Sequence, residues 1–445
     1  MPIPDQHKNR CVYHFTHIDN LPQILEYGLR STNEKKRLSI KHTAIAYEEI
    51  QGRRSCMDVA CGCGGVVHDY VPLYFCKLSL MLLAVVTNKI ADQPLIIHFQ
   101  FPIDIMNQYP CVFTNASANT AKPPLFYDDF SELEQLNWDA IDSLKWSMPS
   151  DSLKQARQAE LLIHRKIDIS SISKIIVWNN AIKEEVLQMY KEANLPAPPV
   201  AGDRYHYYID FYGSNRRSIV TGPFCIKQAY QKTIEDLIPE INQASSPQFD
   251  RLASMLDRIR NDFGCLPETE ELINLKTNNW THKDDVGTHT LTVVNELQEL
   301  EEFRALDQRD KLIVEVAAYL HDIGKGPKSR WAKKSGKQER DADHPIKALP
   351  MLKRILTEEI ETITKRSAML ICKLVCYHDL VGDIIGKSRR IEELIDVVED
   401  ESELNMLIAL GKADIQAIHP DWLNETRIVE VRNRVLDALK SKMPD

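Results

Sequence analysis

A chain of 445 residues is too long for one ordinary hydrophobic core, so its length predicts two or three domains. Its 43% hydrophobic and 27% charged residues are typical of a soluble globular protein. The net charge of −9 excludes a protein that is basic throughout, so any contact with nucleic acid is expected to be local.

The chain shows no pattern of export or of membrane insertion. Its first residues lack the basic and then apolar stretch of a signal peptide. The most apolar run, residues 71–86, is interrupted by Lys77 and is too short for a comfortable membrane helix. The 10 cysteines lack regular spacing, which favours a reduced environment. We therefore expect a cytoplasmic protein with no membrane contact.

The first predicted element is a strand at residues 11–17, in which His14 and Thr16 share one face because strand side chains alternate. These side chains could hydrogen-bond a sugar, although a single strand histidine is more often structural. Asp19 or Asn20 is then expected to cap a short helix that ends at Gly28.

Residues 44–51 have helical character and lead to Arg53 and Arg54, whose planar groups could clamp a phosphate. An exposed arginine pair is otherwise usually a solvated surface. Further strands are predicted at residues 69–75, 94–101, 160–164 and 174–178. Mixed strands and short helices indicate an α+β domain.

Glu160 stands at the head of the predicted strand 160–164, on the face of Leu162 and opposite Leu161. An acid at the end of an otherwise buried strand is a candidate catalytic carboxylate, although taken alone such an acid is more often structural.

Four segments and an aromatic run together resemble the DarT family of DNA ADP-ribosyltransferases, in the same order and at comparable spacing. They are residues 13–21, 45–54, 64–75 and 158–161, followed by residues 205–208. The resemblance implies NAD as donor, a nucleic-acid acceptor, with single-stranded DNA expected, and Arg54 and Glu160 as catalytic residues. The cofactor-binding residues that it implies are His14, Thr16, Asn20, Tyr47, Arg54, Tyr70 and Tyr74.

Those residue types suit the reaction that the resemblance implies. Cleavage of the nicotinamide glycosidic bond leaves a ribosyl cation, so a neighbouring carboxylate stabilises charge that develops only in the transition state. The same carboxylate can activate the attacking base nitrogen. Residues 77–80 and 114–117, expected on the acceptor side, depart from the family pattern, and the acceptor base stays open.

We place a linker at residues 213–224, between a transferase domain at 1–212 and a second domain at 225–445. From Phe249 onwards apolar residues recur at helical spacing, and helical segments dominate to the end. The second domain is therefore expected to be all-α.

Within that domain, Leu312, Val316 and Leu320 place the pair His321 and Asp322 at the inner end of a buried helix. Imidazole and carboxylate groups bind divalent transition metals, and helices that each contribute a ligand form a metal site in a bundle core. The further candidate ligands are His289, His344, His378 and Asp414.

This order of ligands resembles the HD superfamily of metal-dependent phosphohydrolases, which implies a helical fold and one or two metal ions, with Asp322 bridging two. The alternative is that His344 and His378 are surface residues beside a one-metal site. Residues 325–340 carry 7 basic residues against one acid. Such a loop is often merely solvated, but here it predicts a phosphate-attracting rim with Lys325 as a phosphate ligand.

The sequence therefore predicts an ADP-ribosyltransferase joined to an HD phosphohydrolase that processes, reverses or restrains the modification, in a toxin–antitoxin or antiphage-defence role. Two alternatives stay open. One is a nucleotide phosphohydrolase whose N-terminal half only binds NAD or nucleic acid, and the other is an interaction protein without activity.

Overall fold

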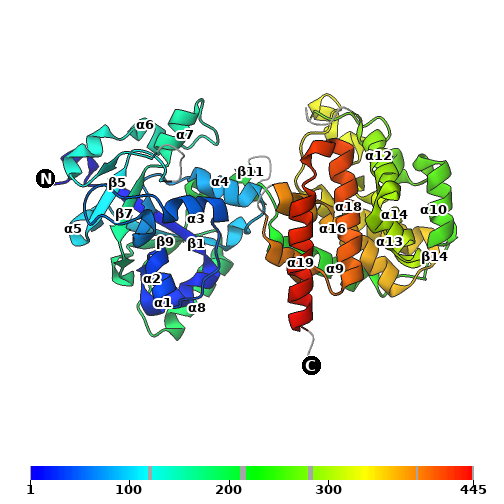
Figure 1. Cartoon of the computed structure of the whole chain (residues 1–445), viewed down its shortest axis with the longest axis horizontal. Helices are drawn as coiled ribbons and strands as arrows, with labels where there is room; N and C mark the ends of the chain where they lie inside the picture. The colour runs from blue at the N-terminus through cyan, green and yellow to red at the C-terminus, as the bar shows by residue number, and fades with distance from the viewer. Residues whose placement is uncertain (1, 119–122, 211–216, 279–283, 387–388, 443–445) are drawn as a thin grey trace. The chain divides into compact units, whose positions relative to one another are not determined.

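The computed structural model describes residues 2–118, 123–210, 217–278, 284–386 and 389–442. The chain divides into two compact units, Met1–Gly222 and Pro223–Asp445. The first unit is built on a β-sheet and the second is almost entirely helical (Figure 1), which confirms the predicted fold classes. Within the described residues, no helix has both the length and the apolar character needed to span a bilayer.

The first unit contains an eight-stranded sheet of order β10-β9-β4-β1-β3-β7-β5-β6. All neighbours in it are antiparallel except β9 and β10. Its strands are β1 Cys11–His17, β3 Tyr70–Tyr74, β4 Ile96–Pro102, β5 Cys111–Thr114, β6 Phe126–Tyr127, β7 Glu160–His164, β9 Lys174–Val177 and β10 Val200–Gly202. The described part of this unit also contains two short strand pairs: β2 Leu29–Arg30 with β8 Lys166–Ile167, and β11 Ile209–Asp210 with β12 Arg217–Ser218.

The register of the central strands positions the residues of the candidate site. Tyr74 of β3 lies opposite both Tyr13 of β1 and Glu160 of β7. The strand β7 is buried on both faces, since Leu161, on one face, and Glu160, on the other, are both inaccessible to solvent. The centre of the sheet therefore holds an acid inside the protein.

Short helices surround the sheet. They are α1 Leu21–Tyr27, α2 Thr32–Arg37, α3 Glu48–Ser55, α4 Leu80–Thr87, α5 Ile105–Gln108, α6 Trp138–Asp142, α7 Asp151–Arg157 and α8 Asn180–Glu192. Gly28 ends α1 with φ 74°, and a Cβ there would lie 2.7 Å from the Ile167 carbonyl oxygen. Only glycine fits this turn.

The helix predicted at residues 44–51 begins later, at Glu48. Its start is displaced because the Asn20 side chain holds the backbone of Thr43: Asn20 Nδ2 donates to the Thr43 carbonyl at 2.9 Å, and Asn20 Oδ1 accepts from the Thr43 amide at 2.7 Å. A long-range contact therefore overrides the local helical tendency of this segment.

In its described residues, the second unit consists of helices and one short parallel strand pair, β13 Phe249–Arg251 with β14 Ile360–Thr362. Phe249, expected in a helix, is in β13, and the helix starts at Leu252. The helices are α9 Pro223–Leu237, α10 Leu252–Asn261, α11 Pro267–Glu270, α12 Val286–Glu299, α13 Glu301–Ala305, α14 Gln308–Leu320, α15 His344–Arg354, α16 Lys365–Gly386, α17 Ile391–Val397, α18 Glu401–Ile418 and α19 Glu425–Lys442.

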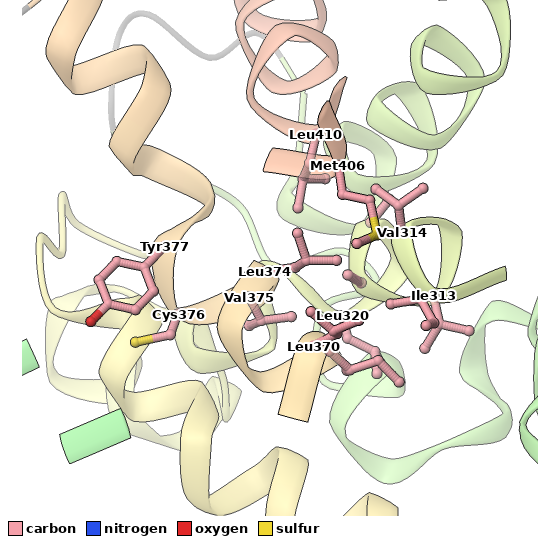
Figure 2. Packing of buried hydrophobic residues seen from close by; sticks show 14 of the residues in the cluster. Ile313, Val314, Leu320, Leu370, Leu374, Val375, Cys376, Tyr377, Met406 and Leu410 are labelled. Carbon is pink, nitrogen blue, oxygen red and sulfur yellow. The ribbon is translucent and has the colours of Figure 1, made fainter. Parts of the chain in front are cut away.

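Helices α14, α16 and α18 meet in an apolar core, which Figure 2 shows from close by. Val314 of α14, Leu374 of α16 and Met406 of α18 belong to this core, and each is inaccessible or nearly inaccessible to solvent. Each such side chain stabilises the fold by about 1.5 to 3 kcal/mol through burial. Helix α16 departs from helical geometry at Tyr377, with φ −116° and ψ 15°, immediately before His378.

Candidate active sites

A cavity of about 370 Å³ in the first unit brings together most of the residues that the sequence predicts for NAD binding and catalysis. Its lining includes His14, Thr16, Asn20, Arg54, Tyr70, Tyr74 and Glu160. Among the described residues of the predicted set, Tyr47 is not part of this lining, and its hydroxyl donates to the Ala84 carbonyl at 3.0 Å.

Arg54 and Glu160 belong to this cavity lining and form a buried bidentate ion pair. Arg54 Nη1 donates to Glu160 Oε1 at 3.0 Å and Nη2 donates to Oε2 at 2.9 Å, and the residues are 7% and 0% exposed. Burial alone would lower the pKa of the Arg54 guanidinium, but the Glu160 carboxylate raises it, so Arg54 stays charged. The Ala118 amide donates a further bond to Glu160 Oε1 at 3.1 Å.

His14 is a neutral group in the cavity wall. Its Nδ1 donates to the Pro72 carbonyl at 2.8 Å, and burial lowers the pKa of the imidazole to about 4. The Nε2 atom is therefore unprotonated and can accept a hydrogen bond. Thr16 lies two residues along the strand and accepts a bond from Asn20 Nδ2 at 2.9 Å, which leaves its own hydroxyl hydrogen able to donate.

Two of the three predicted tyrosines, Tyr70 and Tyr74, line the cavity and are fixed by their hydroxyl groups. Tyr70 donates to the Gly64 carbonyl at 2.7 Å, and Tyr74 donates to Met81 Sδ at 2.9 Å. Burial raises the pKa of both phenols, to about 12 for Tyr70, so both stay neutral. Their rings border the cavity and can pack against a flat ligand.

A second cluster lies in the second unit, where four helices and the turn after α14 contribute its members. Each of three groups holds potential ligand atoms within 4.8 Å of one another. The groups are His289 with His321 and Asp322, then Asp322 with His344 and His378, and finally His378 with Asp379 and Asp414.

Three histidines of this cluster point one nitrogen at a backbone carbonyl. Nδ1 of His321 donates to Ala318 at 2.8 Å, Nδ1 of His344 donates to Asp341 at 2.7 Å, and Nδ1 of His378 donates to Val375 at 2.7 Å. Bonds of this kind fix each ring with Nε2 as the free acceptor, the arrangement of a metal-bound histidine.

The donor set fits a divalent transition metal. His344 Nε2 and His378 Nε2 lie 3.0 Å apart, and burial lowers the pKa of His378 to about 4, so that ring is a neutral ligand. His321 Nε2 and Asp322 Oδ1 are buried without a hydrogen-bond partner in the described structure. A divalent cation would bind between the two Nε2 atoms that face each other. It would also give the two buried atoms without a hydrogen-bond partner a group to bind.

His344 and His378 are 6% and 2% exposed, which excludes the alternative that they are surface histidines. Asp379 joins the cluster although the sequence patterns did not single it out, with its carboxylate 3.7 Å from His378 Nε2 and 4.0 Å from His344 Nε2. The sequence held a signal for it, because His378 and Asp379 repeat the adjacent His-Asp pair of residues 321 and 322.

Lys325 lies inside the cluster rather than on an outer rim. Its Nζ is 2.5 Å from Asp322 Oδ2; burial would lower the pKa of the ammonium, but the carboxylate raises it. Other basic residues of the segment 325–340 form local ion pairs, such as Arg330 with Asp341 and Lys334 with Glu339.

Comparisons with known proteins agree with this division. Residues 13–209 match the family of the ssDNA thymidine ADP-ribosyltransferase DarT, and residues 286–405 match the HD domain. A DNA ADP-ribosyl transferase of Thermus sp. (strain 2.9) is 36% identical over 204 residues, which are 44% of this chain and 95% of that protein.

Two further proteins are similar to the first unit. A DNA ADP-ribosyl transferase–DNA ADP-ribosyl glycohydrolase fusion protein of Thermosipho africanus (strain H17ap60334) is 25% identical over 191 residues, 43% of this chain and 48% of that protein. A solved structure of Thermus sp. 2.9 DarT in complex with NAD+ aligns at 30% identity over 46% of this chain and 100% of that one, with a TM-score of 0.40.

Proposed function

Because this chain belongs to the DarT family of ADP-ribosyltransferases and carries an HD domain, we propose that its first unit transfers ADP-ribose from NAD to a base of single-stranded DNA. The observation that carries this proposal is the buried Arg54–Glu160 pair, which borders one cavity together with His14 and Thr16. The NAD+ complex of the Thermus relative supports NAD as the donor.

In the proposed reaction the bond between the ribose C1′ and the nicotinamide nitrogen breaks, and C1′ bonds to a nitrogen of the base. The Glu160 carboxylate stabilises positive charge on the ribose as nicotinamide leaves, and it accepts the proton that the attacking nitrogen loses. Arg54 holds this carboxylate in one orientation through its two hydrogen bonds. His14 Nε2 and the Thr16 hydroxyl accept from and donate to the ribose hydroxyls.

Incubation of the full chain with labelled NAD and single-stranded oligonucleotides tests this proposal. The expected product is an oligonucleotide heavier by one ADP-ribose. Thymidine is the first nucleoside to examine, because the description of the matching family names it as the acceptor. Oligonucleotides that contain each base in turn identify the acceptor. NAD hydrolysis or binding without any modified nucleic acid is the result that contradicts transfer.

For the second unit we propose metal-dependent phosphohydrolase activity, with His289, His321, Asp322, His344, His378 and Asp414 as the metal ligands. A bound divalent ion would supply a water of lowered pKa and would polarise a phosphoryl oxygen. Lys325, now on Asp322, is in place to take a substrate phosphate instead. Release of phosphate or nucleotide from model phosphodiesters under metal-replete conditions is the direct test.

The two activities share one chain, and we propose that the HD domain trims, reverses or restrains the modification, as part of a toxin or antiphage-defence function. A covalent link raises the effective concentration of one active unit near the product of the other. The Thermosipho relative supports this idea, since it joins a transferase to a glycohydrolase. Under this proposal, Asp322→Ala increases the toxicity of expression, and adding Glu160→Gln removes it.

A nucleotide phosphohydrolase with an NAD- or nucleic-acid-binding unit is the second candidate function. It is favoured by the fact that all three ligand groups belong to the second unit alone, so that unit contains a complete donor set. Harmless expression of Asp322→Ala, together with hydrolysis of free nucleotides by the wild type, supports this candidate over the coupled one.

A further inference from the structure

Lys35 brings a positive charge into the wall of the proposed donor cavity. It lies in α2, which Ser31 caps by accepting a hydrogen bond from the Glu34 amide at 3.2 Å. Its side chain is only partly accessible, and it lines the cavity together with its neighbour Lys36. The sequence patterns gave no reason to single out either lysine.

Most of the other basic groups of this cavity are paired with an acid or neutral. Arg54 places both terminal nitrogens on Glu160, and Arg30 Nε donates to the Tyr27 carbonyl at 2.6 Å. Burial lowers the pKa of His14 and of His68 to about 4, so both rings are neutral near pH 7. The charges that can meet an anionic ligand are those of Lys35 and Lys36, together with Arg30, whose bond to a neutral carbonyl does not offset its charge.

Within the described part of the chain, no carboxylate pairs with the Lys35 ammonium. Burial lowers the pKa of this ammonium to about 8, and the absence of a raising partner agrees with that isolation. A desolvated, uncompensated charge is costly to the fold and is usually retained where a ligand completes it.

The charge of Lys35 also reaches several walls of the cavity. It contributes to the lowered pKa of His14 in β1, of His42 in the loop before α3, and of His68 in the turn before β3. Lys35 therefore lies in the same cavity lining as the ribose-binding and catalytic groups and close enough to influence them.

We propose that Lys35 is the ligand of the donor pyrophosphate, with Lys36 adding a second charge at the rim of the cavity. This inference rests on the proposed function, because it takes the cavity to be the NAD site. A pyrophosphate carries two negative charges and suits the compact ammonium group. In this assignment Arg54 stays on Glu160 while NAD binds, so the catalytic pair is not disturbed by the donor.

The test is titration of the full-length chain with ADP-ribose, which contains the pyrophosphate but no scissile nicotinamide bond. Lys35→Met is expected to weaken ADP-ribose binding at least about tenfold, the effect of losing one charge-assisted hydrogen bond. Lys35→Arg should restore most of the affinity. Arg37→Met is the matched control, because Arg37 lies in the same helix, pairs with Glu34 and does not line the cavity.

Two further measurements distinguish pyrophosphate binding by Lys35 from a purely structural role. The dependence of ADP-ribose affinity on NaCl concentration should become shallower in Lys35→Met, since one ionic contact is lost. Binding of adenosine, which has no phosphate, should be unchanged. Lys35→Gln serves as a second variant if Lys35→Met fails to fold.

The outcomes are distinguishable. If the wild type binds ADP-ribose and Lys35→Met binds it equally well, or if adenosine affinity falls to the same extent, the pyrophosphate assignment is overturned and the proposed function stands. If the wild type binds neither NAD nor ADP-ribose, the proposed function fails, and the assignment of Lys35 fails with it.

Discussion

Arg54 and Glu160 meet through two parallel hydrogen bonds of 3.0 and 2.9 Å, although 106 residues separate them in the chain. Both side chains are almost completely buried, so each depends on the other for its charge to be tolerated. A carboxylate held in this way needs no reorganisation when positive charge develops beside it.

The catalytic role of Glu160 predicts that Glu160→Gln lowers ADP-ribose transfer by about 100-fold or more, the usual effect of losing a general acid–base group. Binding of ADP-ribose should change little, since the carboxylate acts on the transition state. Single-turnover transfer and titration measure the two quantities. Glu185→Gln, at an exposed position of α8, is the control, and transfer at the wild-type rate in Glu160→Gln removes this residue from the mechanism.

The ion pair also predicts a coupled effect on stability. Arg54→Met leaves the Glu160 carboxylate buried without its partner and should lower the free energy of unfolding of the first unit by about 3 to 5 kcal/mol. Adding Glu160→Leu removes the unpaired charge, so the double variant should be more stable than Arg54→Met. Urea unfolding followed by tryptophan fluorescence measures the free energy of unfolding of each variant. If the loss in the double variant equals the sum of the losses in the two single variants, the coupling is contradicted.

The partly buried ammonium of Lys35 leads us to predict that the stability of the folded protein varies with pH. Its pKa is about 8 in the folded chain and 10.5 without burial, so between these values the unfolded chain binds more protons and stability rises with pH. Below pH 8 the penalty is fully present, and Lys35→Met should then stabilise the ligand-free protein by about 1 to 2 kcal/mol. This gain should shrink towards pH 10.

The other charged and titratable side chains of this cavity lining are Arg30, Lys36, Arg54, Glu160, His14, His42, His68, Tyr70 and Tyr74. Burial lowers the pKa of the three histidines, so they are neutral between pH 8 and 10. The pKa values of Arg54, Tyr70 and Tyr74 are raised, so these groups do not change charge in that window either. Thermal unfolding of wild type and variant at several pH values is the measurement. A stability difference that does not depend on pH contradicts the assignment of the penalty to the ammonium.

The metal cluster predicts that protein purified from metal-replete cells contains one or two divalent transition metal ions per chain. The double variant His321→Ala, Asp322→Ala should lose them, as elemental analysis would show. His419→Ala is the matched control, because His419 is an exposed histidine of the same unit. Full metal content in the double variant places the ion elsewhere.

Local sequence patterns predicted the elements that local physics determines. The strands Cys11–His17 and Glu160–His164 have the predicted bounds, because each is a short run rich in apolar residues that suit a buried strand. The helix expected at residues 44–51 was displaced by Asn20, a residue more than twenty positions earlier in the chain. No local pattern reports a contact of that kind.

The candidate sites likewise contain residues that sequence patterns predicted and residues that only the tertiary structure reveals. Histidines and acids at helix ends pointed to a metal cluster, because the residue types themselves are ligands. Lys35 was missed, since an isolated lysine in sequence is usually solvated and only the fold shows what surrounds it. Asp379 was missed although it follows His378 as Asp322 follows His321. The Arg54–Glu160 bond was likewise invisible, because its partners lie in elements that meet only in the tertiary structure.

The side chain of Asn20 uses both N–H groups, one on Thr16 and one on the Thr43 carbonyl, while its oxygen accepts the Thr43 amide. Few side chains can replace it, since aspartate of the same shape offers no donor and would turn a negative charge towards that carbonyl. Variation among relatives at position 20 should therefore be narrow, and a screen of all substitutions there should recover few functional variants. Tolerance of Asn20→Asp in such a screen contradicts this expectation.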